Sequence, residues 1–441
     1  MKKLSRFLWW RTIGSESEVG LTSEHPDDNP DPVYGYTLPN TRTDGSVIHR
    51  LLYGNRLRDA FISNGGRLYI DGFHPEYATP ECIGPDEAAR FTHGTDVLFH
   101  TRVAWLRSLG INCAVFRDNT DWHNSFYAMH ENYQILKPGT IERKFSFAYS
   151  LNAYLTTQWV WGGAGVINVG TGDVSCSVEG EYAGEWARSF RYKAPYASAR
   201  YCERYQRLQI SGEANGLQEV TWLKFAITSL VISMIESDFR DWDELVPDIS
   251  SPVQRKILAS TRGLSITTLG GMRLTPLQIQ RVFAESISQF LLRAELEGLT
   301  VPEWAYRAID RFNLVLDQIG TFQKKGECKP PFKTDWLCKI HLMKVWKGSG
   351  ERDTPQSRKE LNMGYHDTDP YHSLLDGLYA EGAAERMFTQ QQLNATLTCP
   401  SNHPRAKQRA EWYRKLRRDD SSLIMWDSVT VDGVTISLTD G

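Results

Sequence analysis

Strand and helix signals are segregated along this chain of 441 residues, and this feature constrains its fold most strongly. Short segments with strand character gather before residue 140, and long helical segments dominate the middle. The predicted strands span residues 7–21, 67–71, 76–79, 112–117 and 126–136, and the predicted helices span 85–110, 146–161, 217–236, 276–297 and 300–345. Because the two kinds of element do not alternate, we predict an α+β fold with an antiparallel sheet.

A domain boundary is predicted at Asp369-Pro370. It divides the chain into a catalytic domain of residues 1–369 and a small C-terminal domain of residues 370–441. In the second part, Asp432-Gly433 is a strong two-residue turn signal for a terminal hairpin. The elements expected there are helices at about 371–384 and 404–418 and strands at about 423–430 and 434–438.

Charge, apolar content and cysteine usage exclude several classes of protein. Fifty basic and 53 acidic side chains give a formal net charge of −3, which excludes a general polyanion binder, so no nucleic-acid partner is expected. The most apolar segment, residues 225–235, is too short to span a membrane. Seven cysteines form no CxxC pair, which indicates free thiols in a reducing compartment. We predict a cytoplasmic protein without a membrane partner.

The first candidate site lies on the first predicted strand. Glu16 and Glu18 project from the same face there, because side chains on a strand alternate with a period of two. Neighbouring carboxylates raise each other's pKa unless a cation neutralises them, and Mg²⁺ takes oxygen ligands of this kind. A solvated strand face that carries two charges is the alternative interpretation.

The second candidate site is a dense group of polar residues around a turn. Tyr69 and Asp71 share one strand face, and Glu76 opens the next strand. Asp71 has the chemistry of a general base that deprotonates an attacking amine or water, and Glu76 that of a metal ligand. The alternative is a polar turn formed by Gly72 and Pro75.

Three further segments carry weaker signals. His130 lies on a predicted strand, where a lone histidine is more often a core residue than a ligand. Arg207 could reach phosphate oxygens across a sheet, and Trp426 could stack on a flat ring. Arg405 lies at the start of a predicted basic helix, and a solvated helix face is the usual interpretation of such a segment. No P-loop or dinucleotide-binding glycine motif follows a strand, so a bound nucleotide would have to be held by metal, arginine and sheet.

Taken in order, these segments resemble the family of Pup ligase and Pup deamidase, which attach and remove a small ubiquitin-like modifier. Residues 14–20 (GSESEVG) stand where the family's first strand carries G-I-E-T-E-x-G, and residues 67–71 and 74–78 (RLYID, HPEYA) follow its RLYxD and HPEY segments. The other matching segments are residues 119–121, 130–133, 163–165, 205–215, 223–224, 229–236, 335–336, 365–367 and 405–407. The resemblance covers nearly the whole chain.

The resemblance implies a glutamine synthetase-like cradle of antiparallel strands backed by helices. It also implies an ATP- and Mg²⁺-dependent carboxylate–amine ligase that joins a glutamate side chain of a small modifier or peptide to an amine-bearing acceptor. The implied site residues are Asp71 and Tyr69 in catalysis, Glu16, Glu18 and Glu76 at the metal, and Arg207, Asn215, Arg405 and Trp426 at the nucleotide.

The chain also departs from the family pattern. Tyr196 stands where a histidine is expected, and Gln209 replaces another histidine. The two residues Gly72 and Phe73 give the turn the spacing of the deamidase branch, whereas residues 365–367 are similar to the ligase branch. Two alternatives to a ligase therefore stay open, namely a hydrolase of such amide or isopeptide bonds and a catalytically impaired binding protein.

Overall fold

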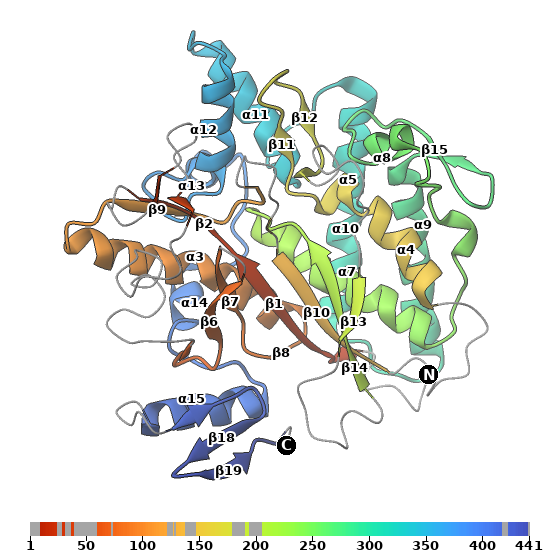
Figure 1. Cartoon of the computed structure of the whole chain (residues 1–441). Helices are drawn as coiled ribbons and strands as arrows, with labels where there is room; N and C mark the ends of the chain where they lie inside the picture. Colours follow the sequence, from red (N-terminus) through yellow and green to blue (C-terminus); the bar gives the residue numbers. More distant parts are fainter. Residues whose placement is uncertain are drawn as a thin grey trace.

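The computed structural model describes residues 9–23, 29–30, 37–38, 60–71, 74–120, 127, 129–136, 147–178, 190–193, 205–416 and 422–439. Among these residues, no helix combines the length and the apolar composition that a membrane span requires. Two packed layers dominate the fold, a central antiparallel sheet and a group of helices behind it (Figure 1).

The central sheet has eight strands in the order β13-β14-β10-β1-β7-β6-β5, with β8 paired to β1. The strand pairs of this sheet are antiparallel, as the segregated sequence signals predict. The strands are β1 Thr12–Glu18, β5 Ala60–Phe61, β6 Arg67–Asp71, β7 His74–Ala78, β8 Cys82–Ile83, β10 Met129–Leu136, β13 Phe190–Lys193 and β14 Tyr205–Gly212.

The remaining strands form small sheets of two or three strands. They are β2 Gly20–Ser23 with β9 Cys113–Phe116, β3 Asn29–Pro30 with β4 Thr37–Leu38, β11 Val166–Ile167 with β12 Val174–Ser175, β15 Ile266–Thr267 with β16 Arg273–Leu274, and β17 Leu423–Ile424, β18 Ser428–Val431 and β19 Val434–Ser437. The single strand predicted over 7–21 is divided at Val19: β1 stays in the central sheet, whereas β2 pairs with β9.

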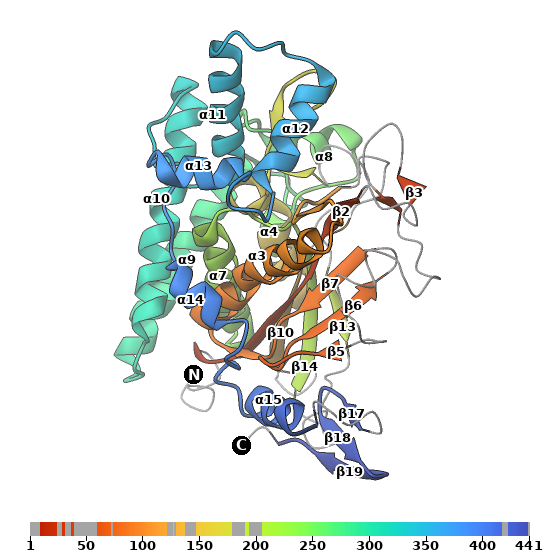
Figure 2. The same ribbon diagram turned by 90° about the vertical axis from the view of Figure 1, so that its left-hand side faces the viewer.

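The helices of the described residues are α3 Pro85–Ser108, α4 Phe147–Thr157, α5 Trp159–Gly162, α7 Gln218–Glu236, α8 Pro252–Leu258, α9 Pro276–Leu296, α10 Glu303–Lys325, α11 Asp335–Gly348, α12 Pro355–Tyr365, α13 Leu374–Ala380, α14 Gln390–Ala395 and α15 Pro404–Leu416. Of these, α3 packs against β1 and α7 against β10, so they cover one face of the central sheet. Figure 2 shows α3 and α7 between the sheet and the outer helices α9 and α10. The opposite face of the sheet is left for polar side chains.

Helix α7 is the centre of the core, since every one of its residues is buried. A helix that is apolar around its whole circumference needs neighbours on all sides, and α7 has β10, α3, α4, α9 and α10. The same sequence feature, the long apolar run at 225–235, therefore marks an internal helix of the protein.

Two buried ion pairs join α7 to the sheet. Lys224 Nζ lies 3.2 Å from Glu131 Oε1 on β10, and both side chains are completely buried. Near the other end of α7, Glu236 Oε2 accepts a hydrogen bond at 3.1 Å from Arg11, which directly precedes β1. Glu236 Oε1 also accepts a hydrogen bond from the backbone N–H of Leu136 at the end of β10. These contacts fix how β1 and β10 lie on α7.

The C-terminal segment places a helix and a three-stranded sheet beside one edge of the molecule (Figure 1). The turn predicted at Asp432-Gly433 joins β18 and β19. The predicted domain boundary at residue 369 stays a prediction; α13 and α14, which follow it, pack against α12 and α3.

The ion pair inside the core yields a first prediction. Lys224→Met leaves the Glu131 carboxylate buried without its cation, so we expect a loss of about 3–5 kcal/mol in the free energy of unfolding, measured by urea denaturation. Asp317→Asn is the control, because it breaks the exposed Arg281–Asp317 pair, and it should cost less than about 1 kcal/mol. Equal effects of the two substitutions would contradict the role given to Lys224.

Candidate active site

A row of acidic side chains crosses the open face of the sheet. Glu16 and Glu18 alternate with buried residues along β1, so they share the face opposite the helices, as predicted. Strand pairing sets Glu18 opposite Glu76 on β7, and Glu76 opposite Tyr69 on β6. Asp71 follows Tyr69 on the same face, at the exposed end of β6. The structure thus brings together all five residues that were predicted for metal binding and catalysis.

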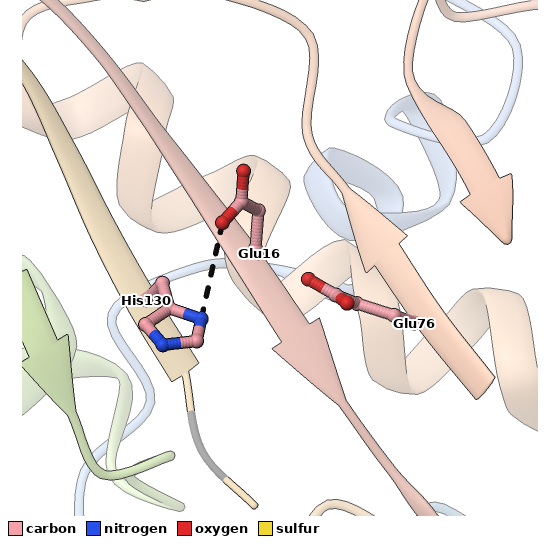
Figure 3. Close-up of side chains that lie close together, drawn as sticks. All are labelled: Glu16, Glu76 and His130. Atoms are coloured by element: carbon pink, nitrogen blue, oxygen red, sulfur yellow. Dashed lines mark ion pairs between the residues drawn. The ribbon is translucent and has the colours of Figure 1, made fainter. Parts of the chain in front are cut away.

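The oxygen and nitrogen atoms of this row form two groups that share Glu76. One group is Glu16, Glu76 and His130, and the other is Glu18, Asp71 and Glu76; within each group the ligand atoms lie within 4.8 Å of one another. Figure 3 shows the first group, with Glu16 between the other two side chains. Either group has the size and donor chemistry of a divalent cation site.

His130 is the residue of this site that the sequence did not identify. A lone histidine on a strand is more often a core residue, as stated above. The structure instead sets His130 opposite Glu16 in the β1–β10 register, with Nδ1 3.8 Å from Glu16 Oε2. The alternation along β10 correctly puts His130 on the face opposite Glu131. The sequence could not show that this face is the one shared with Glu16.

The residues present fit a divalent cation. Glu76 is only 1% exposed, and its Oε2 atom has no hydrogen-bond partner among the residues that the structure describes. Burial, together with the nearby carboxylates of Glu16, Glu18 and Asp71 and against a hydrogen bond from Tyr69, raises the pKa of the Glu76 carboxyl to about 9. Burial and the carboxylates of Glu76, Glu16 and Asp71 also raise the pKa of Tyr69. A bound cation would neutralise the neighbouring carboxylates and so remove their contribution to these raised pKa values.

Strand β14 supplies polar partners to the edge of the acidic row. Gln209 Nε2 donates a hydrogen bond to Glu16 Oε2 at 2.6 Å, and Arg207 Nη1 donates one to Glu16 Oε1 at 3.3 Å. Gln209, which replaces a family histidine, therefore contacts a predicted metal ligand directly. Arg207 lines the neighbouring pocket together with Glu16, and its guanidinium has the donor geometry that suits a phosphate.

A pocket adjoins the acidic row on the side of β10 and β14. Glu16, Arg207, Arg405 and Trp426 line it together, although they come from four separate parts of the chain. Its other lining residues are Thr12, Ile13, Gly14, Ser15, Ala78, Thr79, Glu81, Asn132, Tyr133, Gln134 and Gln206. Basic groups, an aromatic ring and a nearby cation site suit a nucleotide. Thr79 and Glu81 are wall residues that the sequence analysis did not select.

Asn215 is not part of this pocket. Its side chain is completely buried, where its amide donates to Gly162 O at 3.2 Å and to Asp335 Oδ2 at 2.9 Å, and its carbonyl accepts from Lys224 at 3.0 Å. These bonds fix the start of α7, so we assign Asn215 a structural role. Tyr196, the other departure from the family pattern, lies outside the described residues.

The raised pKa of Glu76 yields a prediction for stability. The folded protein keeps this proton up to about pH 9, whereas an unfolded glutamate loses it near 4.5. Without divalent cations, the wild type should therefore lose stability relative to Glu76→Gln as the pH rises through this window, by at most about 1.4 kcal/mol per pH unit. Urea denaturation in EDTA at pH 5, 7 and 9 measures the difference. A difference that is independent of pH would contradict the assignment.

Comparison with known proteins identifies the family. The family described as Pup-ligase protein matches residues 13–182 and 194–430. A Pup–protein ligase of Nakamurella multipartita is 29% identical over 431 residues, which cover 91% of this chain and 89% of the relative. A Pup–protein ligase of Mycolicibacterium smegmatis is 28% identical over 459 residues, with coverages of 98% and 94%.

Solved structures confirm the predicted α+β fold class. The ligase PafA in its complex with the prokaryotic ubiquitin-like protein Pup has a TM-score of 0.78 at 23% identity, covering 98% of this chain and 89% of that one. PafA in complex with ADP has a TM-score of 0.74 at 24% identity, with coverages of 87% and 86%. The family match covers the acidic row on β1, β6, β7 and β10. The chain is therefore a member of the Pup-ligase family.

Proposed function

We propose that this protein is an ATP-dependent carboxylate–amine ligase that forms an isopeptide bond between a glutamate side chain of a small ubiquitin-like modifier and an amine-bearing acceptor. The observation that carries this proposal is the acidic row, in which a buried Glu76 oxygen has no partner within the described part of the chain, beside a pocket lined by Arg207, Arg405 and Trp426. The relatives named Pup–protein ligase and the PafA structures with Pup and with ADP support it.

The chemistry consists of two steps. The glutamate carboxylate attacks the γ-phosphorus of ATP, so that a C–O–P linkage forms and ADP leaves. The amine then attacks the acyl carbon, inorganic phosphate leaves with the bonding electrons, and the nitrogen loses one proton. Both steps develop negative charge on phosphate oxygens, which positive groups on the enzyme must stabilise.

Mg²⁺ would be held by Glu16, Glu18 and Glu76, with the shared position of Glu76 allowing two ions. When bound, it supplies the positive charge that phosphoryl transfer requires. His130 and Asp71 complete the two groups of ligand atoms. Arg207 lies next to Glu16 and would orient the transferred phosphate.

Asp71 is the proposed base. It is exposed at the end of β6, whereas Glu76 is buried, so an incoming acceptor can reach the Asp71 carboxylate. Tyr69 lies two residues before Asp71 on the same face of β6, and it faces the Glu76 carboxyl. We place Tyr69 in the catalytic group through this contact.

We propose that Trp426 and Arg405 bind the flat base of the nucleotide. Trp426 presents an aromatic ring to the pocket, and Arg405 lies on the same wall. We also propose a cytoplasmic location; six cysteines of the described part of the chain are free thiols, which suits a reducing compartment.

A hydrolase that cleaves the same bond is the alternative, motivated by the short turn between Asp71 and His74. The names of the relatives favour the ligase. Incubation with ATP, Mg²⁺, a glutamate-ending modifier and a lysine amine separates the two. The ligase releases ADP over many turnovers only when both substrates are present, and the hydrolase cleaves a modifier–lysine isopeptide without stoichiometric ATP consumption. Absence of ATP turnover with any carboxylate would overturn the ligase.

Asp71→Asn should lower the rate of isopeptide formation by at least about 100-fold, because the attacking amine loses its base. MgATP affinity, measured by calorimetry, should change little if the carboxylate acts as a base rather than as a ligand. Asp317→Asn, on the far outer helix α10, is the control and should keep the wild-type rate. Loss of MgATP binding in Asp71→Asn would instead assign Asp71 to the cation.

A further inference from the structure

We propose that Glu81 is a positioning residue for the nucleotide base, because it docks the C-terminal segment that carries Trp426 against the wall of the pocket. This inference rests on the proposed function and adds a residue to it. Glu81 itself lies between β7, the strand that carries Glu76, and β8, and it belongs to the pocket wall.

The carboxylate of Glu81 is held by two arginines of α15. Arg409 Nη1 donates a hydrogen bond to Glu81 Oε1 at 3.0 Å, and Arg409 Nη2 donates to Oε2, which makes a bidentate pair. Arg405 Nη2 lies 3.7 Å from Glu81 Oε1. Arg409 is completely buried, so this pair is shielded from solvent on its guanidinium side.

Arg409 transfers this anchoring to Trp426. Its Nη1 donates a hydrogen bond to the backbone carbonyl of Trp426 at 2.6 Å, and its guanidinium lies 4.8 Å from the centre of the indole ring. Its Nε also donates to the carbonyl of Gly65, near β5. The edge of the ring packs against Phe61 on β5, with a centroid distance of 4.9 Å. The position of the indole ring therefore depends on Arg409, and Arg409 depends on Glu81.

Charge explains why the carboxylate matters. Burial alone would raise the pKa of Glu81, but Arg409, with Arg405, outweighs burial and holds the pKa at about 2. The carboxylate is therefore ionised over the whole physiological range. A neutral side chain at this position leaves a buried guanidinium without its counter-charge, and Arg409 must then move or draw in water.

Thermodynamic linkage follows from this arrangement. If a base stacks on Trp426 only when the C-terminal sheet is docked, then nucleotide stabilises the docked state, and nucleotide affinity falls in proportion to the fraction of molecules that stay docked. Ligands without a base do not contact Trp426, so the phosphate part of the site should not be affected.

Calorimetric titration of Glu81→Gln with MgATP and with magnesium tripolyphosphate tests this inference. We expect about tenfold weaker MgATP binding, the size of a lost aromatic stack, and unchanged or tighter tripolyphosphate binding. At saturating ATP the rate constant of the ligase should stay near that of the wild type, so that the change appears in KM. Glu411→Gln is the control, because it breaks the exposed Glu411–Lys415 pair on the same helix.

Hydrogen exchange gives a second readout that does not depend on activity. In Glu81→Gln, amide exchange in β17, β18 and β19 should speed up while that of β1 stays unchanged, and MgATP should protect these strands less than in the wild type. Arg409→Lys, which keeps the charge but loses the bidentate pair, should have the same effects if Glu81→Gln does not fold. Equal MgATP affinity in both variants and the wild type overturns the inference, and wild type that binds no MgATP overturns the proposed function instead.

Discussion

The active face of this protein depends on the attachment of α7 to the sheet by buried ion pairs. Lys224 and Glu236 lie near opposite ends of a helix that is otherwise buried against apolar neighbours. Apolar packing alone would tolerate a shifted helix, because it has no direction. A buried charge tolerates no shift, since each carboxylate or ammonium must keep its partner. Glu131 therefore fixes β10 on α7, and Arg11 fixes the start of β1.

This attachment explains how an acidic row can exist at all. With β1 and β10 held from behind, strand register decides which side chains meet on the open face, and Glu16 is set beside His130. Burial and the neighbouring carboxylates together raise the pKa of Glu76. A bound cation would relieve the repulsion between these carboxylates, and the row lies where the pocket begins. The helix layer thus holds the strands in place and keeps the carboxylates of the open face close to one another.

The proposed nucleotide pocket depends on a further contact, between the sheet and the C-terminal segment. Its wall combines β1, β10 and β14 with Trp426 from a segment almost at the end of the chain. A pocket assembled from distant segments needs a specific anchor, and Glu81 with Arg409 has the geometry of one. The proposed cation site and the proposed base site are consequently built by different means, the first by register within one sheet and the second by docking of a separate small sheet.

The sequence by itself determined the features that follow from local periodicity and local chemistry. A period of two places Glu16 and Glu18 on one face, Asp432-Gly433 sets the final turn, and the segregated elements indicate an α+β fold. The tertiary structure decided the rest. It divided the first predicted strand at Val19, turned Asn215 into a buried partner of Asp335, and brought His130 into the acidic row. Each of these outcomes depends on partners more than seventy residues away or on burial, and neither is encoded in the spacing of neighbouring residues.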